Sequence, residues 1–385
     1  MTSLAPPGSP TDDLLTMRRS PSRTTGFRVD VLDQRLTKVG ELHPARPGLS
    51  VEQNINRDVK RTMSGFVIPR TEAVSLNFFA HRARPVWLAS DQTEWPLGVF
   101  LISDASTIRH SWGTTAELSF ADQGLILSQS IDRSVGYGAG TYVREAMLAV
   151  LAAIGLPAYE VDQTEARLGA HVTWGMGRDS WIRVLNDLAD LAGFNSGFFD
   201  NSGTYRLRRA PAANDEAVVD FDYDAPPRVY EDSIVESEAT LESPNRYVVI
   251  STSANSAPIF GTWDVPPDAP HSYENRGYRV VSVVERQGLG LAEATEAARI
   301  RGLQDADTYQ WASFSAAPDP RHDTFNVVRW RGEVWREQSW SLNLDVGAEH
   351  RHELRRSYRP STPAAAAGGL PPIGPSLARL SRTVG

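Results

Sequence analysis

The 385-residue sequence contains no cysteine. Disulfides, thiolate-bound zinc and cysteine nucleophiles are therefore excluded. No run approaches the roughly 20 apolar residues that a membrane helix needs. Arg18 and Arg19 near the start are not followed by the apolar segment of a secretory signal. These absences predict a protein that is made and used in water, without a membrane partner.

A basic excess is also missing, because 39 Lys and Arg stand against 47 Asp and Glu, for a net charge of −8. General nucleic-acid binders usually carry a basic excess, so any DNA near this surface is expected to pass without specific binding. Hydrophobic residues at 41% and charged residues at 22% fit a soluble protein with real cores. The length favours two or three domains.

Short alternating apolar segments fill two parts of the chain and predict β-strands. The first part begins at Phe27 and continues to about residue 135, with Leu125–Leu127 expected as one of its strands. The second part ends near residue 358 and holds one helix over Leu291–Asp305. Many short strands separated by Gly, Pro and Asp favour antiparallel barrels or sandwiches.

A helical insert lies between these β parts. A first helix is expected over Thr141–Ile154, ended by Gly155 and Pro157. A second helix follows in the segment VTWGMGRDSWIRVLNDLADLAGF, with Asp179 or Ser180 as its cap and an apolar face at three- and four-residue steps. A turn at Asn201-Ser202-Gly203 then leads into a basic strand.

These patterns predict an α+β, mainly antiparallel β protein in five segments. They are an N-terminal extension (1–26), a first β domain (27–135), the α+β insert (136–212), a second β domain with one helix (213–358) and a Pro/Ala/Gly-rich tail (359–385). The two ends cannot bury enough apolar surface to form cores. The tail ends in Leu377, Leu380 and Val384, which we expect to dock on a neighbouring subunit.

Two motifs suggest ligands but are better explained otherwise. The run Gly136–Gly140, with Asp162 downstream, departs from the dinucleotide fingerprint because its third glycine falls one residue early. It is expected to be a hinge before a helix. His350 and His352, with Asp345 and Glu349 nearby, alternate so that both imidazoles face one way. Metal binding is conceivable there, but we expect exposed histidines and no metal.

Catalytic arrangements are weak. The acidic run of Glu231, Asp232, Glu236 and Glu238 could supply paired carboxylates for glycan hydrolysis, yet such runs usually face solvent. No serine stands in a G-x-S-x-G context. The sequence therefore predicts a protein that is not an enzyme and needs no cofactor or metal.

Ten tryptophans are the unusual feature of the composition. Trp263 and Tyr273 fall in a Pro-rich stretch, Ile259–Tyr278, that is expected to be a surface loop. Exposed aromatic residues there favour a protein or sugar interface. Capping of the β region's own core is an equal alternative.

The pattern W-G-x-G-x-x-S-W-x-x-x-L-x-D-L-A-x-x-A-G-F, followed by a D-x-x-G turn and a basic strand, resembles the middle of phage tail hub proteins, the minor tail or baseplate hub proteins at the distal end of the tail tube. The resemblance extends loosely from Phe27 to about Tyr358. It implies two tube-like, barrel-like β domains per chain and a homotrimeric ring in the tail tip of the virion, synthesised in the host bacterial cytoplasm.

Such a ring would join the sixfold tail tube or distal tail protein to a threefold tip, near the tape measure and the tail fibre or tip proteins, and DNA would leave through its centre during ejection. Arg206, Arg208 and Arg209 are then expected away from the channel, paired with carboxylates of neighbouring subunits. The alternative is a carbohydrate-binding or glycan-hydrolysing tail protein that contacts the host cell wall.

Overall fold

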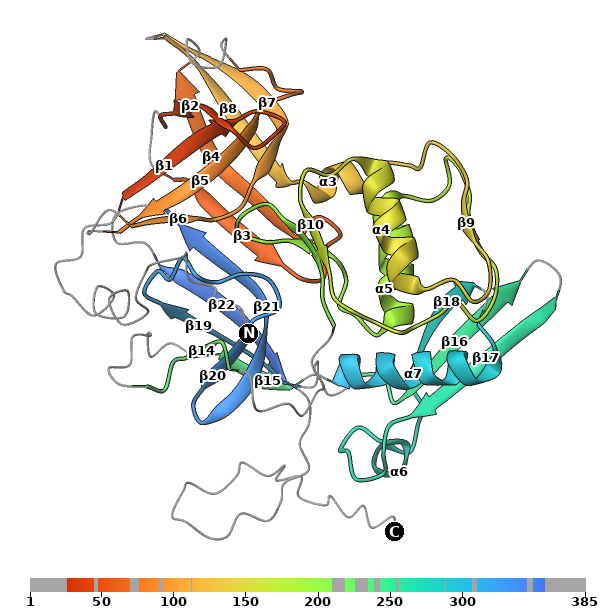
Figure 1. The fold of residues 1–385 in the computed structure, drawn as a ribbon. Helices are drawn as coiled ribbons and strands as arrows, with labels where there is room; N and C mark the ends of the chain where they lie inside the picture. The colour runs from red at the N-terminus through yellow and green to blue at the C-terminus, as the bar shows by residue number, and fades with distance from the viewer. Residues whose placement is uncertain are drawn as a thin grey trace, which may run out of the picture.

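The structure is a computed structural model of the chain, shown in Figure 1. It describes residues 26–44, 48–69, 76–89, 93–111, 113–209, 219–225, 235–238, 243–253, 256–287, 289–306, 310–344 and 349–356. Within these ranges, no helix combines the length and the apolar character that crossing a bilayer would require.

The first β region is entirely antiparallel. Its strands are β1 (Gly26–Leu32), β2 (Lys38–Leu42), β3 (Ser50–Asn54), β4 (Arg61–Pro69), β5 (Arg82–Leu88), β6 (Glu94–Pro96), β7 (Phe100–His110) and β8 (Gly113–Asp122). Alternation along them directs side chains such as Val51, Phe66, Leu118 and Phe120 into one apolar core. The expected strand at Leu125–Leu127 is wrong, because these residues lie in the short helix α3 (Gly124–Leu127).

The second β region continues the same sheet. Its strands are β14 (Phe221–Asp222), β15 (Val235–Glu238), β19 (Gln310–Ala316), β20 (Val327–Trp330), β21 (Glu333–Asn343) and β22 (His350–Arg356). β21 pairs antiparallel with β3, so one 14-stranded sheet runs through both regions. Trp340, Leu342 and Leu344 from the second region therefore enter the core of the first. The expectation of two barrel-like β domains is wrong, because none of the described sheets closes into a barrel and the two regions share one sheet.

The insert packs beside this sheet as two helices with short strands around them (Figure 1). Its elements are β9 (Val135–Tyr137), α4 (Val143–Ile154), β10 (Tyr159–Val161), β11 (Val172–Trp174), α5 (Trp181–Ala192), β12 (Phe198–Phe199) and β13 (Tyr205–Leu207). β12 and β13 form the hairpin around the expected turn, and β10 adds to it in parallel.

The boundaries of α5 follow the local sequence. The Ser180 side chain accepts a hydrogen bond from the Arg183 N–H, which caps the first turn. Gly193 closes the helix at φ +68°, a left-handed conformation that suits glycine. Leu185 and Leu188 are fully buried on the face toward α4. The expected cap, apolar face and closing glycine are confirmed.

A third unit separates the strands of the second β region. It consists of β16 (Arg246–Ser253), β17 (Ser256–Asp264), α6 (Tyr273–Arg276), β18 (Val281–Gln287) and α7 (Leu291–Ala306). α7 lies very close to the sheet, since a Cβ on Gly261 would fall 2.1 Å from the Ala294 carbonyl carbon and one on Gly302 would fall 2.2 Å from the Trp263 ring. Two glycines thus permit this contact.

Candidate functional site

A buried arginine joins the first β region, the insert and the second β region. Arg61 begins β4 and is 1% exposed. Its guanidinium donates to the Leu97 carbonyl at 3.3 Å, to the Asn201 side chain of the insert and to the Asp323 carboxylate of the second β region. It also lies over the Trp340 ring, 5.6 Å from its centroid. A single cation therefore fixes the relative positions of three parts of the chain.

The D-x-x-G turn of the insert is the second part of this junction. Asp200 accepts hydrogen bonds from the Ser202 and Thr204 N–H groups at 2.9 and 3.0 Å and forms an ion pair with Arg206. Burial alone would raise the pKa of Asp200, but the hydrogen bonds from Ser202, Arg206 and Thr204 outweigh it and hold that pKa below its ordinary value. The turn is thus held in shape by an ionised carboxylate.

The same turn docks on both β regions. Gly203 has φ +86°, and a Cβ there would fall 2.7 Å from the Val99 side chain. The Asn201 amide donates to the His322 carbonyl at 3.0 Å. Sequence reasoning identified the turn but not its role as a contact between units.

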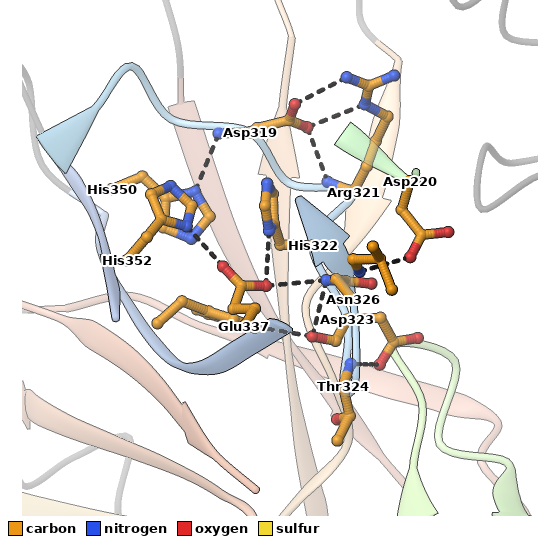
Figure 2. Close-up of polar contacts among 12 residues, drawn as sticks. Asp220, Asp319, Arg321, His322, Asp323, Thr324, Asn326, Glu337, His350 and His352 are labelled. Carbon is orange, nitrogen blue, oxygen red and sulfur yellow. Dashed lines mark hydrogen bonds and ion pairs between the residues drawn. The ribbon is translucent and has the colours of Figure 1, made fainter. Parts of the chain in front are cut away.

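Three histidines meet inside the second β region, where Figure 2 shows them around one glutamate. His350 and His352 come from β22, and His322 comes from the connection between β19 and β20. All three are at most 1% exposed. Glu337 on β21 accepts a hydrogen bond from His322 Nδ1 at 2.9 Å and one from His352 Nδ1 at 2.6 Å. We refer to these three histidines as the histidine cluster.

Further polar and aromatic groups surround the cluster. The Tyr223 hydroxyl lies 2.9 Å from His322 Nε2 and 3.3 Å from His352 Nε2. The Asn326 amide donates to Glu337 at 3.0 Å. The Phe221 ring stacks on His322 at 3.7 Å between centroids. This part of the core is polar at its centre and aromatic around it.

Glu337 is ionised despite complete burial. Burial alone would raise the pKa of Glu337, but the charge of His322 and the hydrogen bonds from His322 and His352 lower it to about 2. The carboxylate oxygens of Glu337 therefore act only as hydrogen-bond acceptors.

The prediction of exposed histidines at 350 and 352 is wrong. The predicted common face is correct, but it is the inner face of β22, which the histidines share with buried Leu354. That leucine is the sequence signal that could have indicated burial. His322 was missed because it lies in a connection far from β22 in sequence. Of the expected nearby acids, Glu349 is exposed and Asp345 lies outside the described residues.

The other candidate ligand motifs have structural roles or fall partly outside the description. Gly136 belongs to β9, which pairs with β11, and Asp162 accepts a hydrogen bond from the Arg209 N–H at 3.0 Å. Glu236 and Glu238 lie on β15, which pairs with β19. The remaining acids of that run, Glu231 and Asp232, lie outside the described residues.

The aromatic interface candidates differ in position. Trp263 is on strand β17 rather than in a loop, so that expectation is wrong, and its half-buried ring contacts Tyr247 at 5.8 Å between centroids. Tyr273 begins α6, is 43% exposed and carries the Arg279 guanidinium 4.5 Å from its ring centroid. The tail candidates are outside the described residues, namely Leu377, Leu380 and Val384.

The basic strand of the insert is satisfied largely within its own chain. Arg206 forms ion pairs with Glu160 and Asp200, so the expectation that it pairs with a neighbouring subunit is wrong. Arg208 lies over the Phe198 ring at 5.8 Å.

Solved structures of tail proteins share the fold of this chain. The tail protein from Neisseria meningitidis MC58 matches with a TM-score of 0.57 at 13% identity, over 86% of this chain and 97% of that one. The prophage MuSo2 43 kDa tail protein from Shewanella oneidensis matches with a TM-score of 0.57 at 10% identity, over 86% and 98%.

Prophage tail protein gp18 from Listeria monocytogenes EGD-e has a TM-score of 0.50 at 11% identity, over 85% and 94%. No protein-family model matches the chain, and a search of curated proteins finds no match. The resemblance to phage tail proteins noted in the sequence is confirmed at the level of fold: the chain has the fold of phage tail proteins.

Proposed function

We propose that this chain is a structural, non-enzymatic protein of a phage tail tip, where three copies form a hub ring. The ring would join the sixfold tail tube or distal tail protein to a threefold tip. The observation that carries the proposal is the agreement of fold with two tail proteins over 97% and 98% of their lengths. Agreement over nearly a whole chain favours a shared architectural role over a shared small module.

The arrangement of the two β regions supports the ring. Three copies of a chain with two β regions offer six β surfaces, which is the number a sixfold partner requires, and closed cyclic symmetry provides the threefold arrangement. The β21–β3 pairing and the Arg61 junction tie the two regions of one chain together. In the ring, each of these two regions would present one β surface to the sixfold partner.

The charge of the chain supports passage of DNA without capture. Each phosphate contact needs a lysine or arginine, whereas the chain carries a net charge of −8 and Arg206 is already paired with carboxylates. We expect the wall of the channel to be acidic or neutral.

A mass measurement tests the ring. In light scattering after gel filtration, the untagged protein is expected at three times the chain mass of 42.4 kDa, and negative-stain class averages should show threefold rings with a central hole. A monomer or an open filament at micromolar concentration would overturn the trimer.

The two ends are proposed as ties between subunits, with Leu377, Leu380 and Val384 as the apolar contacts of the tail. Deleting 1–24 or 362–385 should leave the melting temperature of the chain nearly unchanged, because such compositions bury little apolar surface. The same deletions should impair assembly with tail partners. Loss of folding in either truncated chain would contradict this role.

A further inference from the structure

We propose that His322, His350 and His352 form a structural binding site for a divalent transition metal of the zinc class. The proposal does not depend on the hub ring, because it concerns only the interior of one chain. It begins from geometry: one ring nitrogen of each histidine lies within 4.8 Å of the corresponding nitrogens of the other two.

The three rings are packed against one another in an enclosed space. Their centroids are 4.1 Å apart for His350 and His352, 4.7 Å for His322 and His352, and 4.9 Å for His322 and His350. Ligands bound about 2.0–2.1 Å from a tetrahedral Zn²⁺ lie roughly 3.3 Å apart. The nitrogens would therefore close in by about 1.5 Å at most, which small side-chain rotations can supply.

Glu337 prepares two of the rings for a metal. A carboxylate only accepts hydrogen bonds, so the Nδ1 atoms of His322 and His352, at 2.9 and 2.6 Å, both carry hydrogens. In the neutral rings the lone pairs are then on Nε2. A carboxylate that receives the other ring N–H is the usual arrangement around metal-binding histidines, because it fixes the tautomer and raises the basicity of the ligand.

Both Nε2 atoms face the same oxygen. The Tyr223 hydroxyl oxygen lies 2.9 Å from Nε2 of His322 and 3.3 Å from Nε2 of His352. The two Nε2 atoms therefore lie close together around one oxygen, on the side of the rings that points away from Glu337, and this is where a metal ion would be bound.

His350 would supply the third nitrogen after a small change. The Asp319 N–H approaches its Nδ1 at 3.4 Å, which is long for a hydrogen bond. Coordination through Nε2 would move the ring proton to Nδ1 and give up this weak contact. Coordination through Nδ1 would replace it directly.

The donor set selects the class of metal. Imidazole nitrogens suit zinc, copper, nickel and iron, whereas calcium and magnesium prefer oxygen ligands. The chain has no cysteine, so imidazole is the softest strong donor it can offer. Complete burial of all three rings denies a substrate access, which favours a structural ion over a catalytic one.

The first experiment uses Zn²⁺ as the probe with the full chain after removal of any affinity tag. The protein is unfolded in chelator, refolded with or without Zn²⁺ and dialysed, and the metal is counted by mass spectrometry. One zinc per chain and a higher melting temperature for the zinc form are expected. Less than a tenth of a zinc per chain, with identical melting of both forms, would overturn the proposal.

The second experiment uses matched variants. His350→Gln removes a ligand without removing a hydrogen-bond partner of Glu337, and should reduce bound zinc at least tenfold. The control His271→Gln changes a buried histidine of another unit and should keep one zinc per chain. Unchanged zinc content in His350→Gln would refute the site.

If His350→Gln fails to fold, a measurement on the wild-type chain with Co²⁺ as the probe still tests the site. The wild-type chain refolded with Co²⁺ should show the visible absorption of a tetrahedral cobalt site, bleached by added Zn²⁺. Only the weak absorption of aqueous Co²⁺ would count against the proposal.

Discussion

The helical insert and the second β region lie side by side, yet the core of each is stabilised by different interactions. The insert closes around side chains that are almost all apolar, from Met147 on α4 to Leu185 and Leu188 on α5. The second β region has aromatic rings such as Phe314 and Trp330 around a centre of three histidines and Glu337. The core of the insert depends on filled apolar volume, whereas the core of the second β region depends on a hydrogen-bond partner for each of its polar groups.

This difference sets what each region tolerates. An apolar core accepts changes of shape at moderate cost as long as total volume is kept. A buried polar network is favourable only when every member is paired, because a group left alone in a low-dielectric interior loses its full solvation. The second β region is therefore expected to respond more sharply to single substitutions than the insert.

The largest effect is expected at the junction of the two regions. Arg61→Met leaves Asp323 buried without its cation and should lower the free energy of unfolding by about 3–5 kcal/mol. Urea unfolding at fixed protein concentration measures it. The double variant Arg61→Met/Asp323→Asn should recover part of the loss, because it also removes the buried charge.

Arg246→Met is the matched control for this prediction. Its partner Asp264 is 48% exposed, and exposed ion pairs contribute only about 0.2–1 kcal/mol. If Arg61→Met cost no more than Arg246→Met, the junction would not be the polar centre that the contacts indicate.

A substitution in the core of the apolar insert should lower the free energy of unfolding by as much as Arg61→Met does or by less. Leu185→Ala removes a fully buried side chain and should cost about 2–5 kcal/mol, the range for leucine in a packed core. Met176→Ala, in the same unit but 64% exposed, should stay within about 0.5 kcal/mol of the wild type. A loss below half a kilocalorie for Leu185→Ala would mean that α5 is not packed as described.

The same contrast explains what the sequence could predict. The boundaries of α5 are local, because Ser180 bonds to a residue three positions on and Gly193 needs only its own backbone angle. The histidine cluster depends on residues far apart: Tyr223 lies 129 positions from His352. Alternation predicted the common face of His350 and His352 but not which face was covered.

Two other differences have the same cause. Leu125–Leu127 is too short for periodicity to separate a helix from a strand, and the structure makes it helical. The nearby prolines predict a loop at Trp263, but pairing with β16 makes it part of a strand. In both places, tertiary contacts rather than the local sequence determine the secondary structure.

A smaller effect is expected at Asp200, the charged turn within the insert. Asp200→Asn weakens hydrogen bonds to an ionised group and should cost roughly 1.5–3 kcal/mol at neutral pH. The pKa of Asp200 is lowered in the folded chain below its ordinary 3.8, so its stabilisation is fully present above that value and is lost as pH falls through the folded pKa.

The difference in unfolding free energy between wild type and Asp200→Asn should thus be constant near neutral pH and shrink below about pH 4. Asp132→Asn, whose side chain is 76% exposed, is the control and should differ little from the wild type. A difference that grew in acid would show that the carboxylate destabilises the turn.

The smallest effect on folding is expected at Tyr273, where the comparison moves from cores to surfaces. Its ring is 43% exposed at the start of α6, so Tyr273→Ala should change the free energy of unfolding by no more than about 0.5 kcal/mol. Trp263→Ala removes a ring packed between Tyr247 and Gly302 and should cost about 1–3 kcal/mol.

Exposed aromatic rings often anchor interfaces. Tyr273→Ala should therefore weaken assembly of the tail, measured by co-sedimentation with tail partners, while melting as the wild type does. Normal assembly of Tyr273→Ala would remove this tyrosine from the interface and leave Leu377, Leu380 and Val384 as the candidates.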